Sequence, residues 1–522
     1  MSLSLASVIT EGRRCFADEV ALIENQNRYT YHDLADMVLS VAAFLKSKGI
    51  ERGDKIGLIG PNRPEFTICY YGILAAGATV VSLNTLLVGD EIAYQLENSE
   101  AVGIFSDPEN LLQALDGQSR VESCEWVALC AFDRPDKPNE TKDYVTVGEI
   151  LNQYAPLITY ENTRPDDTAV VMYTSGTTGH PKGAELTHYN LWENARMVSE
   201  RLFAPTEREV KIIGPGYIAI AVLPLYHSFG QTCVQNSMLF NGGAITYQKR
   251  FDPVEAVEII HRDQVRILDA VPTIYNALLH AEGVDPKKLL SVEYGISGGA
   301  ALPIEVGAAF MEKFGMKIQE GYGLTETSPV ASAQPQWIEP KVGSIGRPIP
   351  GCEMKIFDEN DQEVPPGSDG EVVIRGRNIM KGYLNQPEAT AQVMRNGWFH
   401  SGDIGRMDED GDFYIVDRKK DMIIRGGYNV YPREVEEVLY AHPDVQEASV
   451  IGVPDAHYGE EVKAVVAVRQ DANITAEQII EYCKKHVAAY KYPRSVDFVP
   501  ELPKGPTGKI LRREIREAYV KK

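Results

Sequence analysis

One stretch of eleven residues, YTSGTTGHPKG (173–183), gathers small hydrogen-bond donors around a single lysine. It directly follows TAVVMY (168–173), a short β-branched run typical of a buried strand. Glycines let backbone N–H groups approach an anion, hydroxyls add donors, and Lys182 supplies a positive charge. The candidate donors are Thr174, Ser175, Gly176, Thr177, Thr178, Gly179 and Gly183. This pattern predicts a phosphate-binding loop. Two other points bear on it: Gly/Ser/Thr clusters also form ordinary surface loops, and Pro181 replaces the glycine that a Walker loop requires before its lysine.

The composition restricts the kind of protein that carries this loop. Of 522 residues, 44% are hydrophobic and 24% are charged, as in ordinary globular proteins. The formal net charge of -22 argues against a nucleic-acid binder, because phosphate neutralisation requires clustered lysine and arginine. An anionic substrate therefore needs a local basic pocket within an unfavourable overall field.

Cysteine usage and sorting patterns predict a cytoplasmic protein. The seven cysteines are dispersed, without CxxC pairs or zinc-ligand spacing, which fits a reducing compartment better than a disulfide scaffold. Residues 1–15 lack the basic-then-apolar pattern of a secretory signal. No apolar run approaches the roughly 20 residues needed to span a bilayer.

The elements that must position the loop alternate between helix and strand patterns. Apolar residues at helical spacing predict a helix within 30–50, and the short apolar runs 55–60, 78–83 and 168–173 predict buried strands. We expect 184–197 to continue from the loop as a helix. Such alternation predicts an α/β fold with largely parallel sheets.

The pattern changes toward the C-terminus. Residues 402–427 predict a hairpin whose turn lies at 408–411, and the charged segment 417–421 leads into a smaller unit of mixed strands and helices. We therefore divide the chain into a large body, residues 1–419, and a small α+β cap, residues 420–522.

Six further motifs follow the phosphate-loop string. They are PLYHSFG (224–230), SGGAAL (297–302), EGYGLTETSP (320–329), GWFHSGD (397–403), YIVDRKKDMI (414–423) and PKGPTGKILRRE (503–514). In this order, the seven motifs resemble those of the adenylate-forming superfamily, which contains acyl-CoA synthetases, peptide-synthetase adenylation domains and luciferases. The resemblance extends over nearly the whole chain. It implies the adenylate-forming enzyme fold: a large N-terminal body of stacked α/β sheets with a small mobile C-terminal α+β domain.

The resemblance also implies an ATP site. Tyr322 would stack on adenine, Thr325 would contact the α-phosphate, and Glu326 would hold Mg²⁺. Without the resemblance, Glu326 is more simply an acid that caps a helix. Asp403 would accept both ribose hydroxyls beside Arg418. The remaining residues assigned to the nucleotide are Thr174, Ser175, Gly176, Thr177, Thr178, Gly179, Lys182, Gly298, Gly299, Ala300, Glu320, Gly321 and Gly323.

The cap is implied to serve two steps. Lys509 resembles the lysine that stabilises charge on the carboxylate and α-phosphate during adenylation, although a basic solvated tail is the simpler interpretation of its surroundings. Arg425, Gly426 and Gly427 resemble the loop that faces coenzyme A after the cap re-orients about Lys420.

The acyl site is implied by His227, which lies in the YHSFG segment with Phe229. A buried structural histidine is the alternative for His227. The acyl channel would be lined by small residues and apolar walls, namely Gly298, Gly321, Gly323, Tyr226, Val271 and Val330. An amino acid substrate would call for a buried acid to meet its ammonium group, and residues 270–276 contain none.

The motif wording is most similar to bacterial medium- and long-chain fatty acid–CoA ligases. We therefore expect ATP-dependent ligation of a fatty acid to coenzyme A through an acyl-adenylate, with Mg²⁺. The alternatives are transfer to a carrier protein, a coumarate-like aryl acid substrate, luciferase-like oxidation, and a nucleotide-binding regulator without catalysis. A homodimer and peripheral membrane contact are both compatible with the sequence.

Overall fold

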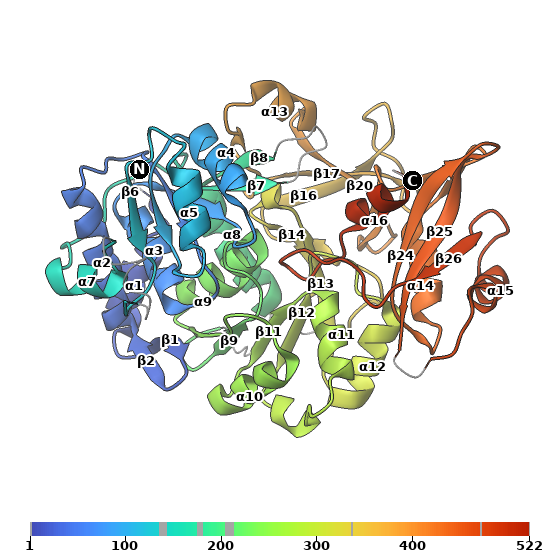
Figure 1. Cartoon of the computed structure of the whole chain (residues 1–522), viewed down its shortest axis with the longest axis horizontal. Helices are drawn as coiled ribbons and strands as arrows, with labels where there is room; N and C mark the ends of the chain where they lie inside the picture. The colour runs from blue at the N-terminus through green and yellow to red at the C-terminus, as the bar shows by residue number, and fades with distance from the viewer. Residues whose placement is uncertain are drawn as a thin grey trace.

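The computed structural model describes residues 3–134, 144–174, 181–203, 213–335, 338–469 and 472–520. Two large sheets pack against helices to form most of the body, a smaller antiparallel sheet lies beside them, and the cap lies at one end (Figure 1). The expected α/β class is confirmed. No helix within the described ranges is long and apolar enough to cross a membrane.

One large sheet carries the predicted phosphate loop. Its strand order is β18-β8-β7-β4-β3-β5-β6, and β7, β4, β3, β5 and β6 run parallel. The strands are β3 (Lys55–Ile59), β4 (Thr79–Leu83), β5 (Ala101–Ser106), β6 (Trp126–Leu129), β7 (Thr168–Thr174), β8 (Lys182–Thr187) and β18 (Gly382–Tyr383). The predicted helix over 184–197 is wrong in its first residues: 182–187 pair with β7 as an antiparallel strand, and the helix begins at His188.

The other large sheet forms the second wall of the body. Its order is β15-β14-β13-β12-β11-β9-β10-β1-β2. The strands are β1 (Val20–Glu24), β2 (Asn27–Thr30), β9 (Ile218–Ala221), β10 (Ala244–Tyr247), β11 (Ile267–Ala270), β12 (Tyr294–Ser297), β13 (Ile318–Gly323), β14 (Val330–Ala333) and β15 (Arg347–Pro348). Strands β9 to β13 end at one edge, where the polar motifs 297–302 and 320–329 begin.

The helices of the body bury apolar surface against both large sheets, most of them in one main core, while α4 and α5 pack in a separate cluster. Helix α2 begins with a capping box in which Thr30 and Asp33 satisfy each other's backbone N–H groups. Helix α3 is buried on every side, which explains its continuous apolar sequence. The helices are α1 (Ser7–Phe16), α2 (Tyr31–Ser47), α3 (Pro64–Ala75), α4 (Gly89–Ser99), α5 (Leu111–Gln118), α7 (Val147–Gln153), α8 (His188–Phe203), the π-helical η1 (Gly230–Asn236), α9 (Ser237–Phe240), α10 (Pro253–Asp263), α11 (Pro272–His280), η2 (Pro286–Leu289), α12 (Ile304–Phe314), η3 (Thr325–Thr327) and α13 (Pro387–Val393).

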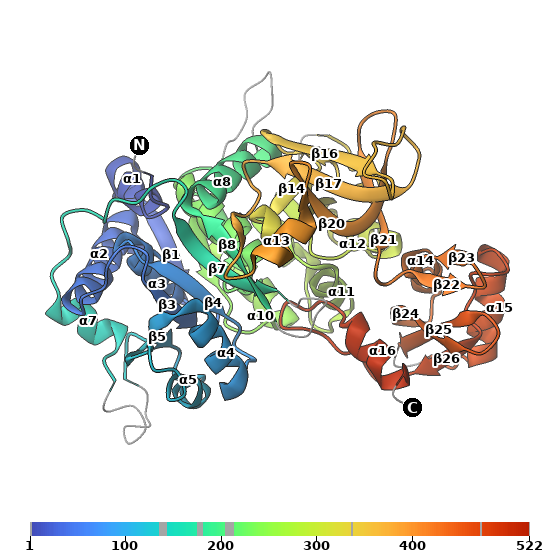
Figure 2. The ribbon, with the colours of Figure 1, turned by 90° about the horizontal axis from the view of Figure 1, so that it is seen from above.

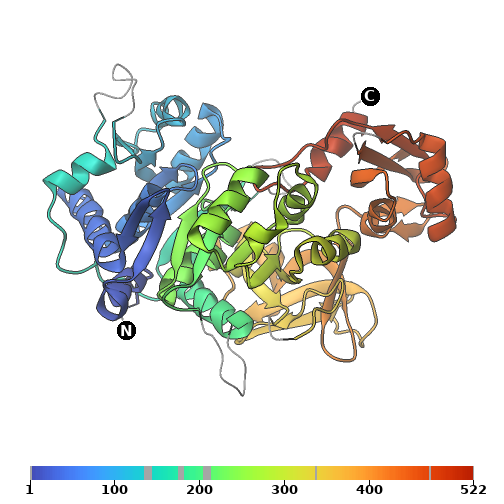
Figure 3. The ribbon, with the colours of Figure 1, turned by 90° about the horizontal axis from the view of Figure 1, so that it is seen from below.

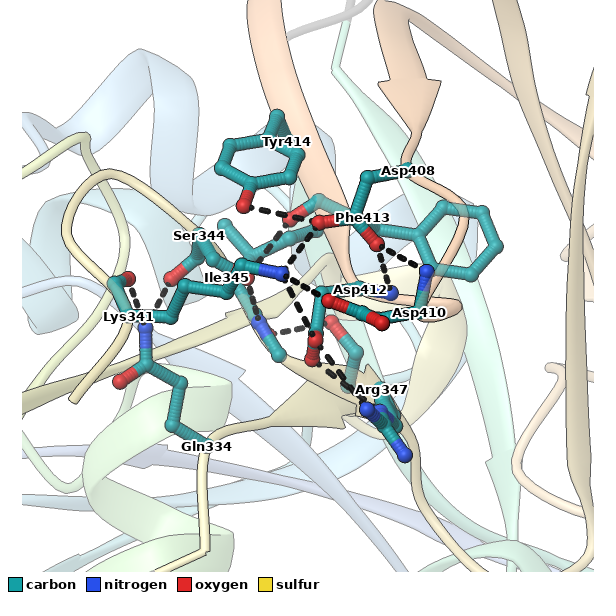
Figure 4. Close-up of polar contacts among 12 residues, drawn as sticks. Gln334, Lys341, Ser344, Ile345, Arg347, Asp408, Asp410, Asp412, Phe413 and Tyr414 are labelled. Carbon is teal, nitrogen blue, oxygen red and sulfur yellow. Dashed lines mark hydrogen bonds and ion pairs between the residues drawn. The ribbon is translucent and has the colours of Figure 1, made fainter. Parts of the chain in front are cut away.

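The third sheet contains the predicted hairpin, which is confirmed as far as Arg418; Ile423–Arg425 instead pair with strands of the cap. The strands of this third sheet are β16 (Cys352–Phe357), β17 (Gly370–Gly376), β19 (Met394–Arg395), β20 (Trp398–Met407) and β21 (Phe413–Arg418), and β20 pairs antiparallel with β21. Three carboxylates at the turn surround the ammonium of Lys341, with distances of 2.5 Å to Asp408, 3.1 Å to Asp410 and 3.4 Å to Asp412 (Figure 4). The hydrogen bond to Asp408 raises the pKa of Lys341. Lys341 thereby supplies the positive charge that this acidic turn needs.

The cap has hydrophobic clusters separate from that of the body, around residues such as Val435, Leu439 and Val450. Its elements are β22 (Ile423–Arg425), β23 (Tyr428–Val430), α14 (Pro432–Tyr440), β24 (Val445–Asp455), β25 (Gly459–Val468), α15 (Ala476–His486), β26 (Ser495–Phe498) and α16 (Arg512–Val520). Its sheet has the order β23-β22-β25-β24, and β26 also pairs with β25.

The segment before α16 runs from the cap to the body, where it meets the start of α11 (Figures 2 and 3). Thr273 Oγ1 donates a hydrogen bond to the carbonyl oxygen of Gly508 at 2.8 Å. Two further contacts join helices of the body to the cap: Asn276 Nδ2 donates to Gln446 O at 3.3 Å, and Ile304 N donates to Glu437 Oε2 at 3.2 Å.

Candidate active site

The described ends of the phosphate-loop string belong to β7 and β8. Thr174 and Lys182 are paired in register on these two antiparallel strands. Ser175, Gly176, Thr177, Thr178 and Gly179 lie outside the described residues. The ammonium of Lys182 lies 5.2 Å from the centre of the Tyr383 ring, which belongs to the neighbouring strand β18.

The carboxylate of Glu326 lies beside this hairpin, although it comes from the other large sheet's edge. Glu326 Oε1 accepts a hydrogen bond from Tyr383 Oη at 2.8 Å and one from Thr174 Oγ1 at 3.4 Å. Thr325, its neighbour in η3, lies 3.5 Å from Ser228 through their hydroxyl oxygens. The two sheets therefore bring together a lysine, a carboxylate and hydroxyl groups at one place.

A second polar group joins β13 to the β20–β21 hairpin. Tyr322 Oη donates to Asp403 Oδ2 at 2.7 Å, and Arg418 Nε lies 3.5 Å from Asp403 Oδ1. Asp403 and Arg418 are paired in register on adjacent strands, which fixes the guanidinium beside the carboxylate. These three residues, expected from separate motifs, do lie together.

Lys509, in the cap, lies within electrostatic range of this group. Burial, followed by the charge of Arg418, lowers the pKa of Lys509 to about 7, and the charge of Asp403 opposes this shift. The adjacent Gly508 fits closely against the body, because a Cβ there would lie 2.9 Å from Thr273 Oγ1. The lysine is thus held near the body's polar groups rather than in a solvated tail.

His227 lies within the electrostatic reach of Lys509. Burial, and then the charge of Lys509, lower the pKa of His227 to about 4, so its imidazole is neutral at pH 7. Its Nδ1 accepts the backbone N–H of Phe229 at 3.3 Å, which places the proton of the neutral ring on Nε2. Nε2 is therefore a hydrogen-bond donor.

The glycines of the motifs 297–302 and 320–329 have different surroundings. A Cβ on Gly298 would lie 3.0 Å from the ring of Phe229, so this glycine faces the His227 segment. Gly299 has φ +78° and, like Ala300, is exposed at the end of β12. Gly323, in contrast, packs against backbone, since a Cβ there would lie 1.9 Å from the carbonyl oxygen of Pro329. A Cβ on Gly321 would make only ordinary contacts with β14.

Glu320 stabilises the turn that follows β12 through a side-chain hydrogen bond. Its Oε2 accepts the backbone N–H of Leu302 at 3.1 Å, and burial raises its pKa to about 7. The side chain is 7% exposed. In this structure Glu320 contacts the turn that would flank a nucleotide.

The three residues expected at a coenzyme A site form part of the cap hairpin β22–β23. The guanidinium of Arg425 is bound to Glu461 at 2.5 Å and lies 4.0 Å from the centre of the Tyr458 ring. Gly426 and Gly427 form the exposed turn of this hairpin, with φ values of +57° and +86° that strongly favour glycine. In the observed cap orientation it is Lys509, carried on a different part of the cap, that meets the body.

Three residues near these groups were not identified from the sequence. Tyr383 binds Glu326, but it is 57 residues away in the chain, and no motif spacing connects them. Thr273 anchors the Lys509 loop. Asp269 lies immediately before residues 270–276, the segment without an acid, and it is buried in the middle of the sheet. Its position next to that segment is the signal that the sequence offers.

Taken together, the described residues bring charged and hydroxyl-bearing side chains of the body near a lysine of the cap. Comparison with known proteins shows the class of protein. Residues 10–384 match the family model described as AMP-binding enzyme, and residues 434–509 match its C-terminal domain.

The chain therefore belongs to the AMP-binding enzyme family. It is 37% identical over 547 residues to a long-chain-fatty-acid–CoA ligase of Bacillus subtilis, covering 98% of this chain and 94% of that protein. A feruloyl-CoA synthase of Amycolatopsis is 34% identical over 501 residues, covering 94% of each.

Solved structures resemble the whole chain. ATP-bound MatB from Rhodopseudomonas palustris has a TM-score of 0.88 and 28% identity, and covers 99% of both chains. The anthranilate CoA ligase AuaEII in complex with anthranoyl-AMP has a TM-score of 0.90 and 26% identity, covering 100% of this chain and 98% of that one. The adenylate-forming fold expected from the sequence is confirmed.

Proposed function

We propose that this enzyme joins a medium- or long-chain fatty acid to coenzyme A in two steps. In the first, a carboxylate oxygen attacks the α-phosphorus of ATP, the α–β phosphoanhydride bond breaks, and pyrophosphate leaves. In the second, the thiol sulfur of coenzyme A attacks the acyl carbon and AMP leaves. The observation that carries this proposal is that Thr273 holds the Lys509 loop of the cap against the body, with Lys509 within electrostatic range of Asp403 and Arg418.

The nucleotide would be held between the two large sheets. We assign the ribose hydroxyls to Asp403, whose two oxygens suit a vicinal diol, with Arg418 beside them and Tyr322 against adenine. The phosphates would meet Lys182 and Thr174 with the loop between them. Gly298, Gly299 and Ala300 would form the flat wall beside the base.

Glu326 fits a magnesium ligand. It is a carboxylate close to Thr174 and Lys182, and hard oxygen ligands are the ones that Mg²⁺ prefers. When bound, Mg²⁺ would neutralise phosphate charge near the scissile bond. Tyr383 orients this carboxylate by its hydrogen bond to Oε1.

Three side chains of this protein would stabilise adenylation directly. Lys509 would hold the carboxylate and α-phosphate oxygens as negative charge builds between them, and Thr325 would donate to the α-phosphate. His227, neutral at pH 7 with a proton on Nε2, can donate a hydrogen bond without adding a second positive charge beside Lys509.

The thiol step requires a different cap orientation. Lys509 and the turn Gly426–Gly427 are on different parts of the cap, so both cannot approach the acyl carbon in one arrangement. We assign the pivot to Lys420, between β21 and β22, and the division of body from cap to residues 419 and 420. Arg425 would contact coenzyme A only after exchanging its contact with Glu461 for a phosphate.

The fatty acid assignment is supported by the relatives from Bacillus subtilis and Escherichia coli that are named long-chain-fatty-acid–CoA ligases. An aryl acid is the second candidate, because a feruloyl-CoA synthase and an anthranilate CoA ligase are also similar over nearly the whole chain. The seven free thiols support a reducing, cytoplasmic location.

The proposal is tested by pyrophosphate release from ATP with a panel of alkyl and aryl acids, with and without coenzyme A. We expect acid-dependent release, and stoichiometric AMP and acyl-CoA when coenzyme A is the only thiol. Release that required a carrier protein instead of coenzyme A would contradict the assigned acceptor.

A further inference from the structure

Asp269 is a buried carboxyl group that the proposed chemistry does not use. It lies on β11, is 2% exposed, and its Oδ1 has no hydrogen-bond partner among the described residues. Burial raises the pKa of Asp269 to about 7. A buried polar atom without a partner costs free energy, so its presence calls for a functional explanation.

Asp269 lies two residues before Val271, farther from the edge of the sheet at which the proposed site lies. Side chains of an extended chain alternate, so Asp269 and Val271 lie on the same face, roughly 6.7 Å apart. Val271 adjoins the Lys509 loop, because a Cβ on Gly508 would lie 3.2 Å from Val271 Cγ2. It also adjoins Gly299, because a Cβ added to Gly299 would lie 3.4 Å from Val271 Cγ1.

The opposite wall at this depth is η1, which packs against β9 and β11. Phe229, which faces Gly298, immediately precedes η1, and Cys233 follows Phe229 by about one helical turn. Burial, and then the charge of Asp269, raise the pKa of the Cys233 thiol, so the two side chains lie within electrostatic range of each other. Thr232 on the same helix is also buried, with no partner for its Oγ1 among the described residues.

An acyl group that extended inward from Lys509 and His227, on the side of Phe229 and Val271, would approach Asp269. We propose that Asp269 is a specificity-determining residue at the inner end of the acyl site, and that the enzyme selects carboxylic acids with a hydroxyl group remote from the carboxyl. This inference rests on the proposed acid–CoA ligase function.

The chemistry favours a hydroxyl group over a plain alkyl end. A hydroxyl both donates and accepts hydrogen bonds, so it can pair with Asp269 in either protonation state. An unsubstituted chain would remove water from the carboxyl group without replacing its hydrogen bond, and a site built to bind a hydroxyl rejects the analogue that lacks it.

Matched substrate pairs test this proposal. We would measure kcat/KM by pyrophosphate release, with coenzyme A present, for dodecanoate against 12-hydroxydodecanoate and for cinnamate against 4-hydroxycinnamate. The unaltered enzyme should prefer the hydroxylated member of at least one pair by about tenfold or more. Asp269→Leu should abolish that preference and Asp269→Asn should keep most of it. Ser449→Ala removes a buried hydroxyl of the cap that has no hydrogen-bond partner in the described part of the chain, and it should leave the ratio unchanged.

The outcomes separate this inference from the function on which it rests. Acyl-CoA formation with equal or better use of the unsubstituted member in both pairs overturns the role of Asp269 alone. If Asp269→Leu does not fold, the substrate ratios of the unaltered enzyme still decide. A lack of pyrophosphate with every acid overturns the ligase assignment and the inference together.

Discussion

Replacing Lys509 by alanine should impair the first half-reaction and spare the second. Lys509 is held near Asp403 and Arg418 by the Thr273–Gly508 hydrogen bond, so its ammonium is positioned before the substrates react. Losing one preorganised transition-state donor costs roughly 10²–10³ in rate, or about 3–4 kcal/mol of activation free energy. Formation of acyl-CoA from supplied acyl-AMP needs the other cap orientation and should change by less than about threefold.

The assay measures acid-dependent exchange of pyrophosphate into ATP beside thioester formation from synthetic acyl-AMP. Lys504→Ala is the matched control, since Lys504 lies in the same segment but pairs with Glu447 within the cap at 2.7 Å. Similar losses in both half-reactions of Lys509→Ala would refute the positioning argument.

The same residue predicts a pH dependence. Burial, followed by the charge of Arg418, lowers the pKa of Lys509 to about 7, so in the free enzyme it loses its proton as the pH rises through this value. Because kcat/KM reports ionisations of free enzyme, adenylation kcat/KM should fall above about pH 7. This limb should be missing from the residual activity of Lys509→Ala. If the residual activity of Lys509→Ala still fell at the same pH, the ionisation would belong to another group.

Three further changes test other parts of the site. Lys420→Pro fixes φ at the pivot, so adenylation should persist while acyl-CoA formation falls by about 10²-fold or more. Lys420→Ala should keep both activities. Unimpaired thioester formation in the proline variant would show that Lys420 is not the pivot. Glu326→Gln should lower the adenylation rate about 10²-fold and raise the Mg²⁺ concentration needed for half-maximal rate. Tyr383→Phe keeps the ring beside Lys182, so it should lower the adenylation rate by less than about tenfold. Asp403→Asn should raise KM for ATP about 10- to 100-fold and reduce discrimination against 2′-deoxy-ATP, and an unchanged preference for ATP would contradict ribose recognition.

Local sequence rules anticipated much of the fold where local chemistry decides it. The helix α2 and the β20–β21 hairpin follow from a capping box, helical spacing and turn residues that act over a few positions. Residues 182–187 contain helix-favouring alanine, glutamate and leucine, yet they form β8 because pairing with β7 outweighs their intrinsic preference.

Motif resemblance named residues from separate motifs, of which Tyr322, Asp403 and Arg418 lie together, whereas their further neighbours depend on tertiary structure. Nothing local shows that Tyr383 would meet Glu326, or that Thr273 would hold the carbonyl oxygen of Gly508. Arg425 illustrates the converse: its sequence context predicts coenzyme A contact, but in this cap orientation Glu461 neutralises it. The unpartnered state of Asp269 likewise depends on what η1 places opposite β11.

The central claim is that one site first activates an acid with ATP and then passes it to a thiol, with the cap serving both steps. A single-turnover experiment tests it most directly: enzyme in excess over ATP, a reactive acid from the panel, rapid acid quench and mass spectrometric detection. We predict that acyl-AMP accumulates without coenzyme A and converts to acyl-CoA and AMP when coenzyme A is added. Acyl-CoA formed with release of ADP and phosphate, and no acyl-AMP at any time, would contradict the account.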